Sequence, residues 1–135
     1  MAAPERFAEL EAIVHPMVRA AEHDFLQRHF ANGSNIAVIE IPLLFETGAE
    51  ELFDKVVVVS TSLEKQKERV LERPGMNADK FQEILKRQMP DAEKREKADF
   101  IVDTGGTIDE TEAQTEAIFA KLRSESGTAY HRHWA

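Results

Sequence analysis

The chain has 135 residues, of which 42% are hydrophobic and none is cysteine, and its formal net charge is -8 at pH 7. This length suits one domain with a single core, while the lack of cysteine excludes disulfides and thiolate metal sites and favours a reducing compartment, the cytoplasm. The acidic balance argues against a nucleic-acid partner, and no segment approaches the roughly twenty apolar residues that span a bilayer.

The first forty residues predict two helices and a strand. Apolar residues recur at spacings of three and four over residues 4–30, as in a helix that faces a core. Pro16 lacks a backbone donor, so we expect a break after His15 and a second helix that opens at Pro16. The apolar run 36–41 is rich in β-branched residues and stops at Pro42, which indicates a buried strand that leads into a loop.

A second buried strand is predicted over residues 55–60, because four consecutive valines suit a strand that is covered on both faces. Thr61 and Glu64 have the spacing of a capping box, which opens a helix that reaches about residue 72. A further helix is predicted over residues 78–88 from its one-sided apolar pattern.

The last part of the chain predicts a short helix over residues 92–97, a third strand over 99–102 and a helix that begins at the capping box 107–110 and reaches about Arg123. Residues 124–135 show no periodicity, and we expect a mobile tail. Strands that alternate with helices indicate an α/β domain over residues 1–123, with parallel strands and sites in the loops beyond the strand ends.

The basic residues are concentrated in one segment. Residues 65–97 hold ten of the seventeen basic residues against seven acids. Gln66, Arg69 and Arg73 share one helix face, where two guanidiniums suit phosphate oxygens. The alternative is a solvated face on which the arginines pair with neighbouring glutamates.

Turn residues bracket the second helix of this basic hairpin, at residues 74–75 and 90–91. The hairpin is therefore either a mobile cover that closes over a site or a rigid surface insertion. The loop 103–106 offers backbone amides to a base or phosphate, or is only a tight turn. Glu40 and Glu46 could anchor a metal or polar group, or simply cap a loop, and we predict no metal site from the histidines.

Five segments, in their order and spacing, resemble dephospho-CoA kinase from about Pro4 to about Arg123. They are the following: Leu10-Glu-Ala-Ile-Val-His-Pro-Met-Val-Arg19, Ile41-Pro-Leu-Leu-Phe-Glu-Thr-Gly48, Gln66-Lys-Glu-Arg69, Arg87-Gln88 and Ala98-Asp-Phe-Ile-Val-Asp103. The resemblance implies transfer of the γ-phosphate of ATP, with Mg²⁺, to the ribose 3′-hydroxyl of dephospho-CoA, the last step of coenzyme A synthesis.

The resemblance also implies roles for single residues. The hairpin over about 62–90 resembles the lid of the family, and Arg69 matches its catalytic, ATP-facing arginine, with Arg73 as a second lid cation. Thr104 and Gly105 fall where the family's loop approaches adenine, although the family often has asparagine at position 104. Glu40 stands where many members have aspartate. The acceptor-substrate side corresponds to His15, Pro42, Leu43, Leu44 and Glu46.

The sequence contains no G-x-x-x-x-G-K-[ST] motif, the P-loop that cradles phosphates in such kinases. We therefore expect an incomplete P-loop kinase-type three-layer sandwich, in which the central strand that carries the P-loop is absent. A sheet without that strand leaves backbone groups unpaired, so we expect the isolated chain to be inactive, of marginal stability and able to self-associate through its sheet edges.

Two other functions remain open from the sequence. The chain could be a non-catalytic module that binds a nucleotide or coenzyme A, or that docks onto another subunit. It could also keep the kinase reaction and use a nucleoside monophosphate as the acceptor.

Overall fold

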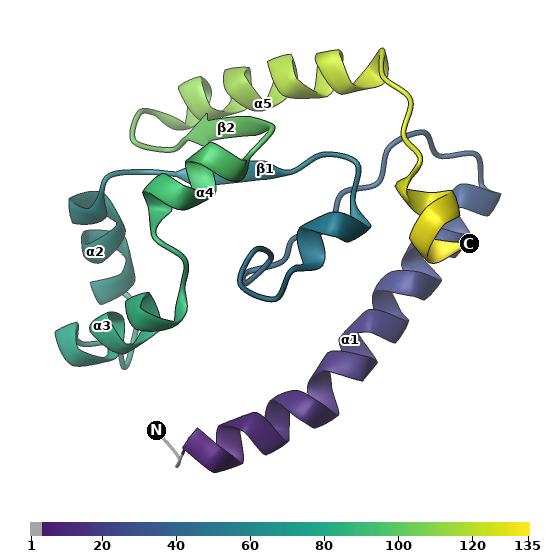
Figure 1. The fold of residues 1–135 in the computed structure, drawn as a ribbon. Helices are drawn as coiled ribbons and strands as arrows, with labels where there is room; N and C mark the ends of the chain where they lie inside the picture. The colour runs from purple at the N-terminus through teal and green to yellow at the C-terminus, as the bar shows by residue number, and fades with distance from the viewer. Residues whose placement is uncertain (1–3) are drawn as a thin grey trace. The chain divides into compact units, whose positions relative to one another are not determined.

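A computed structural model of the protein describes residues 4–135. These residues form two compact units, the first made of the chain up to Glu40 together with Thr128–Ala135, and the second of Ile41–Gly127. The sequence predicted one domain over residues 1–123 followed by a tail. Each unit has its own helices, and the sheet lies in the second (Figure 1).

The first unit is built on α1, a single helix over Pro4–Ala31. The predicted break is wrong, because the helix continues through Pro16. Proline at this position removes only its own hydrogen bond to the preceding turn, and the remaining bonds of a 28-residue helix keep the chain helical on both sides. Gly33, with φ 82°, ends the helix in the left-handed conformation that favours glycine.

The chain end folds onto α1 within this unit. Residues Tyr130–Trp134 form one turn of π-helix, η2, where the sequence predicted no regular structure. The Tyr130 ring stacks on Phe30 with 4.1 Å between ring centroids, and Trp134 is buried. Mobility of residues 124–135 stays a prediction.

The apolar stripe of α1 is largely exposed in the structure. Leu10, Val14 and Met17 were expected to face a core, yet 56%, 40% and 67% of their surfaces are accessible. Helical periodicity shows which residues share a face, but it does not supply the element that covers that face.

The second unit contains a two-stranded parallel sheet of β1 (Val57–Ser60) and β2 (Phe100–Asp103). The backbone amide of Val56 donates to Asp99 Oδ2 at 2.8 Å, and the Asp99 amide returns a bond of 3.0 Å to the Val56 carbonyl. This reciprocal pair fixes the register in which Val57 lies beside Phe100.

Helices fill the crossover between the strands and follow the second strand (Figure 1). Ser62 caps the first of them through the Lys65 amide, one residue beyond the predicted cap Thr61. Thr107 caps the last, as predicted, through the Glu110 amide. The short 3-10 helix η1, Ala49–Leu52, precedes β1. The crossover holds α2 (Leu63–Leu71), α3 (Ala78–Arg87) and α4 (Asp91–Lys97), and α5 (Ile108–Arg123) follows β2.

The first predicted strand, over residues 36–41, does not form, because these residues are irregular and pair with no other described segment. A β-branched run favours an extended chain, but a strand also needs a neighbouring backbone in register. The finding leaves a short α/β arrangement with two parallel strands in place of three.

The valines of β1 alternate between a buried and an exposed face. Val56 and Val58 join Phe45 in the core of the unit, with Leu44, Met89 and Ala98 packed against them. Val57 and Val59 are 42% and 66% exposed, so the expectation of a strand covered on both faces is wrong for this structure. Successive side chains of a strand point to opposite faces, and one face of β1 packs on the core while the other is exposed, so burial follows the period of two.

No helix in residues 4–135 combines the length and the apolar character that crossing a bilayer requires.

Two neighbouring lysine substitutions test this alternation. Val58→Lys places an unpaired charge in the core and should cost more than about 3 kcal/mol of unfolding free energy, enough to unfold the second unit. Val59→Lys changes an exposed side chain and should alter the unfolding free energy by less than about 0.5 kcal/mol. Urea titration followed by circular dichroism measures both; equal losses would contradict the observed alternation.

Candidate functional site

The candidate site lies at the edge where both strands end. In a parallel sheet the carboxyl ends lie together, and Ser60 pairs in register with Asp103. The chain after β1 enters α2, while the chain after β2 forms the loop 104–106 before α5. This arrangement brings the basic face of α2 to the loop that the sequence predicted to bind a nucleotide.

Arg69 reaches from α2 to Thr104. Its Nη2 donates to the Thr104 carbonyl at 2.7 Å, and its Nη1 donates to the Thr104 hydroxyl at 3.2 Å. One turn earlier on the same helix, Lys65 Nζ donates to the carbonyl oxygen of Gly105. Arg69, Thr104 and Gly105, which the sequence singled out separately, are therefore neighbours in the structure.

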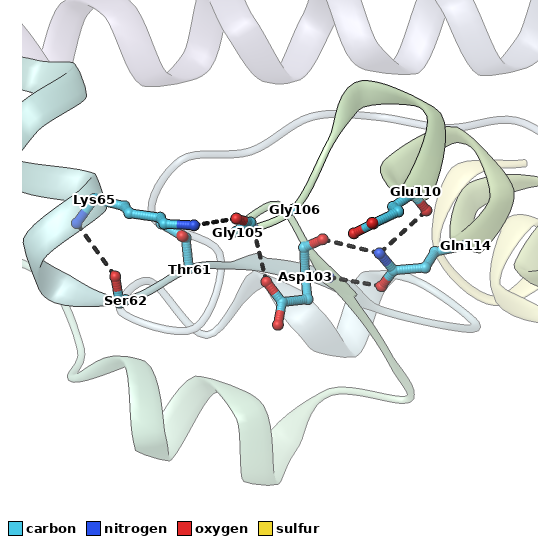
Figure 2. A pocket seen from close by; sticks show the side chains of 8 residues that line it. All are labelled: Thr61, Ser62, Lys65, Asp103, Gly105, Gly106, Glu110 and Gln114. Carbon is cyan, nitrogen blue, oxygen red and sulfur yellow. Dashed lines mark hydrogen bonds between the residues drawn. The ribbon is translucent and has the colours of Figure 1, made fainter.

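The loop is held in shape by Asp103 and by α5. Asp103 Oδ1 accepts from the Gly105 amide at 2.7 Å, the geometry of a turn closed by a side chain. Gln114 on α5 pairs with the main chain of Asp103: its Oε1 accepts from the amide and its Nε2 donates to the carbonyl, each at 2.9 Å (Figure 2). Because one side-chain amide satisfies both backbone groups, it continues the hydrogen bonding of β2 beyond the sheet.

Two pockets flank this contact. The first has both carboxylates and amides in its wall and is lined by Thr61, Ser62, Lys65, Asp103, Gly105, Gly106, Glu110 and Gln114 (Figure 2). The second combines cations with apolar side chains and is lined by Thr61, Gln66, Arg69, Val70, Arg73, Met76, Phe81, Ile84 and Gln88.

The second pocket confirms that Gln66, Arg69 and Arg73 share one face. The alternative, in which the arginines pair with Glu68 and Glu72, is not observed among the described residues, where Glu83 and Glu46 pair with Lys86 and Lys94. Arg69 uses two of its five N–H donors on Thr104, which leaves three for a ligand.

Thr61 lines both pockets, and its Oγ1 is buried without a hydrogen-bond partner among the described residues. A buried hydroxyl normally has a partner, so this group is suited to a ligand that enters from either side.

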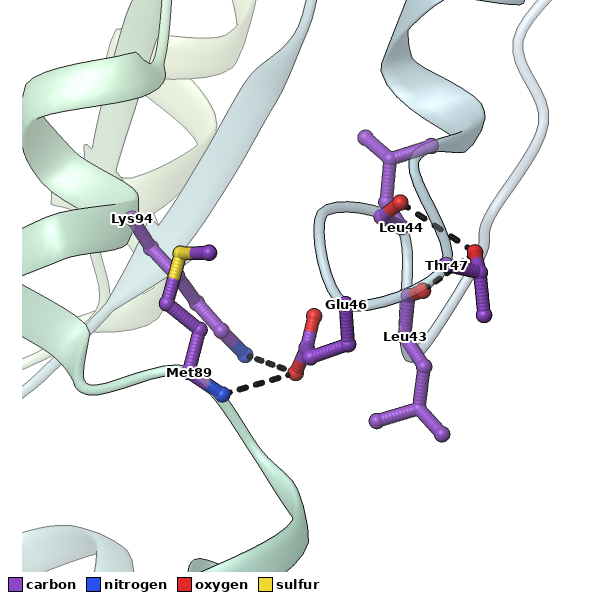
Figure 3. Close-up of polar contacts among 6 residues, drawn as sticks. All are labelled: Leu43, Leu44, Glu46, Thr47, Met89 and Lys94. Atoms are coloured by element: carbon purple, nitrogen blue, oxygen red, sulfur yellow. Dashed lines mark hydrogen bonds and ion pairs between the residues drawn. The ribbon is translucent and has the colours of Figure 1, made fainter.

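The other residues implied by resemblance do not line these pockets. His15 is exposed on α1 in the first unit, and Glu40 is exposed at the end of that unit. Pro42, Leu43, Leu44 and Glu46 belong to one loop in the second unit, where Glu46 is tied to Met89 and Lys94 (Figure 3). In the part of the chain that the structure describes, no three histidine, aspartate or glutamate side chains are grouped to hold a metal ion.

Lys65, Gln114 and Ser60 are polar residues of this edge that the sequence analysis missed. Lys65 stands four residues before Arg69, a spacing that places both on one face and could have revealed it. Gln114 and Ser60 act through long-range contacts, for which the local sequence carries no signal.

The chain is similar in sequence to known proteins of one family. The family model described as dephospho-CoA kinase matches residues 1–110. A protein named dephospho-CoA kinase from Rhizobium meliloti is 56% identical over 124 residues, which are 92% of this chain and 64% of the relative. One of the same name from Agrobacterium fabrum is 53% identical over 119 residues, 88% of this chain and 61% of the relative.

A solved structure agrees with these relatives. A crystal structure of a protein from Thermus thermophilus superposes with a TM-score of 0.69 at 33% identity, covering 90% of this chain and 62% of that one. The chain thus spans about three fifths of the length of the relatives that it matches.

The two hydrogen bonds from the Gln114 side chain to the main chain of Asp103, here called the clip, should hold the loop 104–106 in its conformation. We expect Gln114→Ala to raise the hydrogen-exchange rate of the Asp103 amide about tenfold, because that amide loses its acceptor. Thr115→Ala is the matched control, since the Thr115 hydroxyl bonds within its own helix to the Thr111 carbonyl. Unchanged exchange at Asp103 would show that the clip does not hold the loop.

Proposed function

Since this chain belongs to the dephospho-CoA kinase family, we propose that it provides the lid and the acceptor wall for ATP-dependent phosphorylation of the ribose 3′-hydroxyl of dephospho-CoA in the cytoplasm. The observation that carries the proposal is the convergence of α2 and the loop 104–106, where Arg69 spans from one to the other. Cations and exposed backbone groups meet there at the carboxyl edge of a parallel sheet, where open α/β sheets bind nucleotides.

The chemistry of the site suits ATP. The transferred phosphoryl group spreads negative charge over its oxygens, and cations positioned at that charge lower the barrier. Arg69 and Arg73 present planar donors that match phosphate oxygens, and the loop presents main-chain groups that match a purine edge. We assign Arg69 to both ATP binding and catalysis, Arg73 to ATP binding, and Thr104 and Gly105 to the base.

We assign acceptor binding to one loop of the second unit, the acceptor wall, with Pro42, Leu43, Leu44 and Glu46, and separately to His15 of the first unit. Pro42 is exposed, and the two leucines are half-buried, so the loop offers apolar surface to the pantetheine side of dephospho-CoA. This assignment rests on the family resemblance.

Mg²⁺ neutralises charge on ATP in reactions of this class. The described residues provide no set of ligands for it, so no step is assigned to a metal held by this chain. We place the metal and the phosphate cradle on a P-loop, a motif that the sequence does not contain. The strand that carries this P-loop would lie beside β1.

Adding a P-loop tests this function directly. A segment that carries G-x-x-x-x-G-K-[ST] on a strand is fused ahead of Met1, and we call the product the extended enzyme. Formation of coenzyme A from ATP and dephospho-CoA should be at least about 10³-fold faster with the extended enzyme than with the chain alone, because backbone and lysine donors at the phosphates are restored.

The control is the extended enzyme with its P-loop lysine replaced by alanine. ATP binding measured by calorimetry without turnover in either form would favour the non-catalytic module, and turnover only with a nucleoside monophosphate would favour the other acceptor. Light scattering on the same samples tests self-association, which we expect to fall when the fused strand covers the free edge of β1.

Arg69→Ala in the extended enzyme should lower kcat by about 10²-fold or more, because a cation that stabilises the transition state is lost. Lys67→Ala on the same helix removes one exposed positive charge that does not line either pocket, and it should leave kcat within about twofold. Steady-state kinetics decides: an unchanged kcat for Arg69→Ala would remove this residue from the catalytic machinery.

A further inference from the structure

We propose that Glu46 is a positioning residue that fastens the acceptor-side loop 41–48 to the return segment 88–97, which leads from the basic hairpin back to β2. This inference rests on the proposed function for the meaning of the two segments. Its structural part, the link itself, stands on contacts within the second unit.

The link is made by one carboxylate oxygen. Glu46 Oε2 accepts from the Met89 backbone amide at 2.9 Å and lies 3.6 Å from Lys94 Nζ (Figure 3). Met89 lies in the turn between α3 and α4, and Lys94 lies within α4. A single side chain therefore holds both the start of the return segment and the helix that follows.

Burial strengthens this link relative to a surface ion pair. The side chains of Lys94 and Glu46 are 19% and 14% exposed, whereas those of the pair Lys86–Glu83 are 73% and 63% exposed. Shielded charges attract more strongly and are screened less by salt. Loss of Glu46 would also leave a part-buried amide and a part-buried ammonium without their acceptor.

Hydrogen bonds within the acceptor-side loop join the residues on either side of Glu46. Thr47 Oγ1 donates to the Leu43 carbonyl at 2.8 Å, and the Ala49 amide donates to the Leu44 carbonyl at 2.9 Å. Leu44 and Met89 also pack against the same core cluster. A displacement of Met89 is therefore transmitted through Glu46 to the leucines of the acceptor wall.

A second anchor holds the return segment at the site edge. Ser60, 3% exposed at the end of β1, donates to the carboxylate of Asp91 at 2.9 to 3.0 Å and accepts from Arg95 Nη1 at 3.0 Å. Through Met89, Asp91, Lys94 and Arg95, the return segment is tied to the rest of the second unit. The return segment is thus held at the end of β1 by Ser60, and Glu46 attaches the acceptor wall to the return segment.

A different role for Glu46 is direct contact with the acceptor, since its Oε1 has no hydrogen-bond partner among the described residues. The two roles predict different measurements. If Glu46 contacts the acceptor directly, its substitution should change only KM for dephospho-CoA. If Glu46 is a positioning residue, its substitution should change hydrogen exchange of the Met89 amide and KM for both substrates.

Hydrogen exchange on the 135-residue chain tests the link without any activity. Glu46→Ala should raise the exchange rate of the Met89 amide about tenfold, while Glu46→Gln, whose side-chain oxygen can still accept, should change it by less than about threefold. Glu83→Ala, which breaks the exposed pair, should leave Met89 unchanged. Amides of β2 report whether each variant is folded, and Glu46→Gln keeps the test open if the alanine variant is not.

Kinetics of the extended enzyme tests the coupling. Glu46→Ala should lower kcat about tenfold and raise KM for both ATP and dephospho-CoA, with Glu46→Gln restoring most of kcat. Unchanged exchange at Met89 in a folded alanine variant overturns the link, and a rise in KM for dephospho-CoA alone overturns the coupling. If the extended enzyme makes no coenzyme A, the proposed function fails while the exchange result still decides the link.

Discussion

The parallel pairing of β1 with β2 is the constraint on which the site depends. The reciprocal bonds between Val56 and Asp99 set the register, and that register places Ser60 beside Asp103. The segments that follow the two strand ends, α2 and the loop 104–106, meet at this edge. Arg69 can reach Thr104, 35 residues away in the chain, only because both segments leave the sheet at the same edge.

Single polar side chains, more than apolar burial, fix the connections around that edge. The core cluster of the second unit is small, with Phe45, Val56 and Val58 buried. Gln114 holds the loop after β2, Ser60 holds α4, and Glu46 holds the turn that precedes α4. Ser60 and Glu46 satisfy groups that would otherwise lie part-buried without a partner, and Gln114 pairs with exposed main-chain groups of Asp103. Such links fix geometry even where little apolar area is available.

The family to which the chain belongs has members that extend well beyond the matched region. Under the proposed function, this chain contributes the cations, the base-binding loop and the acceptor wall, while the phosphate cradle lies on another segment. Val57 and Val59 lie on the exposed face of β1. Among the described residues β1 pairs with β2 alone, so the strand proposed to carry the phosphate cradle would pair with the other edge of β1.

The sequence by itself determined the elements whose signals are local. The periodicity of residues 78–88, the cap at Thr107 and the valine run after Lys55 predicted α3, α5 and β1, since propensity and capping act within a few residues. The shared face of Gln66, Arg69 and Arg73 followed from helical spacing alone. The family resemblance also came from the sequence, because its motifs are contiguous.

Only the tertiary structure decided what depends on partners far along the chain. Residues 36–41 have the composition of a strand but pair with no other strand among the described residues, and Pro16 lies within a helix that continues past it. The roles of Gln114, Ser60 and Glu46 depend on atoms up to 43 residues away, to which no local pattern points. A hydrogen bond needs two groups, and burial needs a neighbour that covers the side chain. These partners come together only when the chain folds, so a local stretch of sequence does not show them.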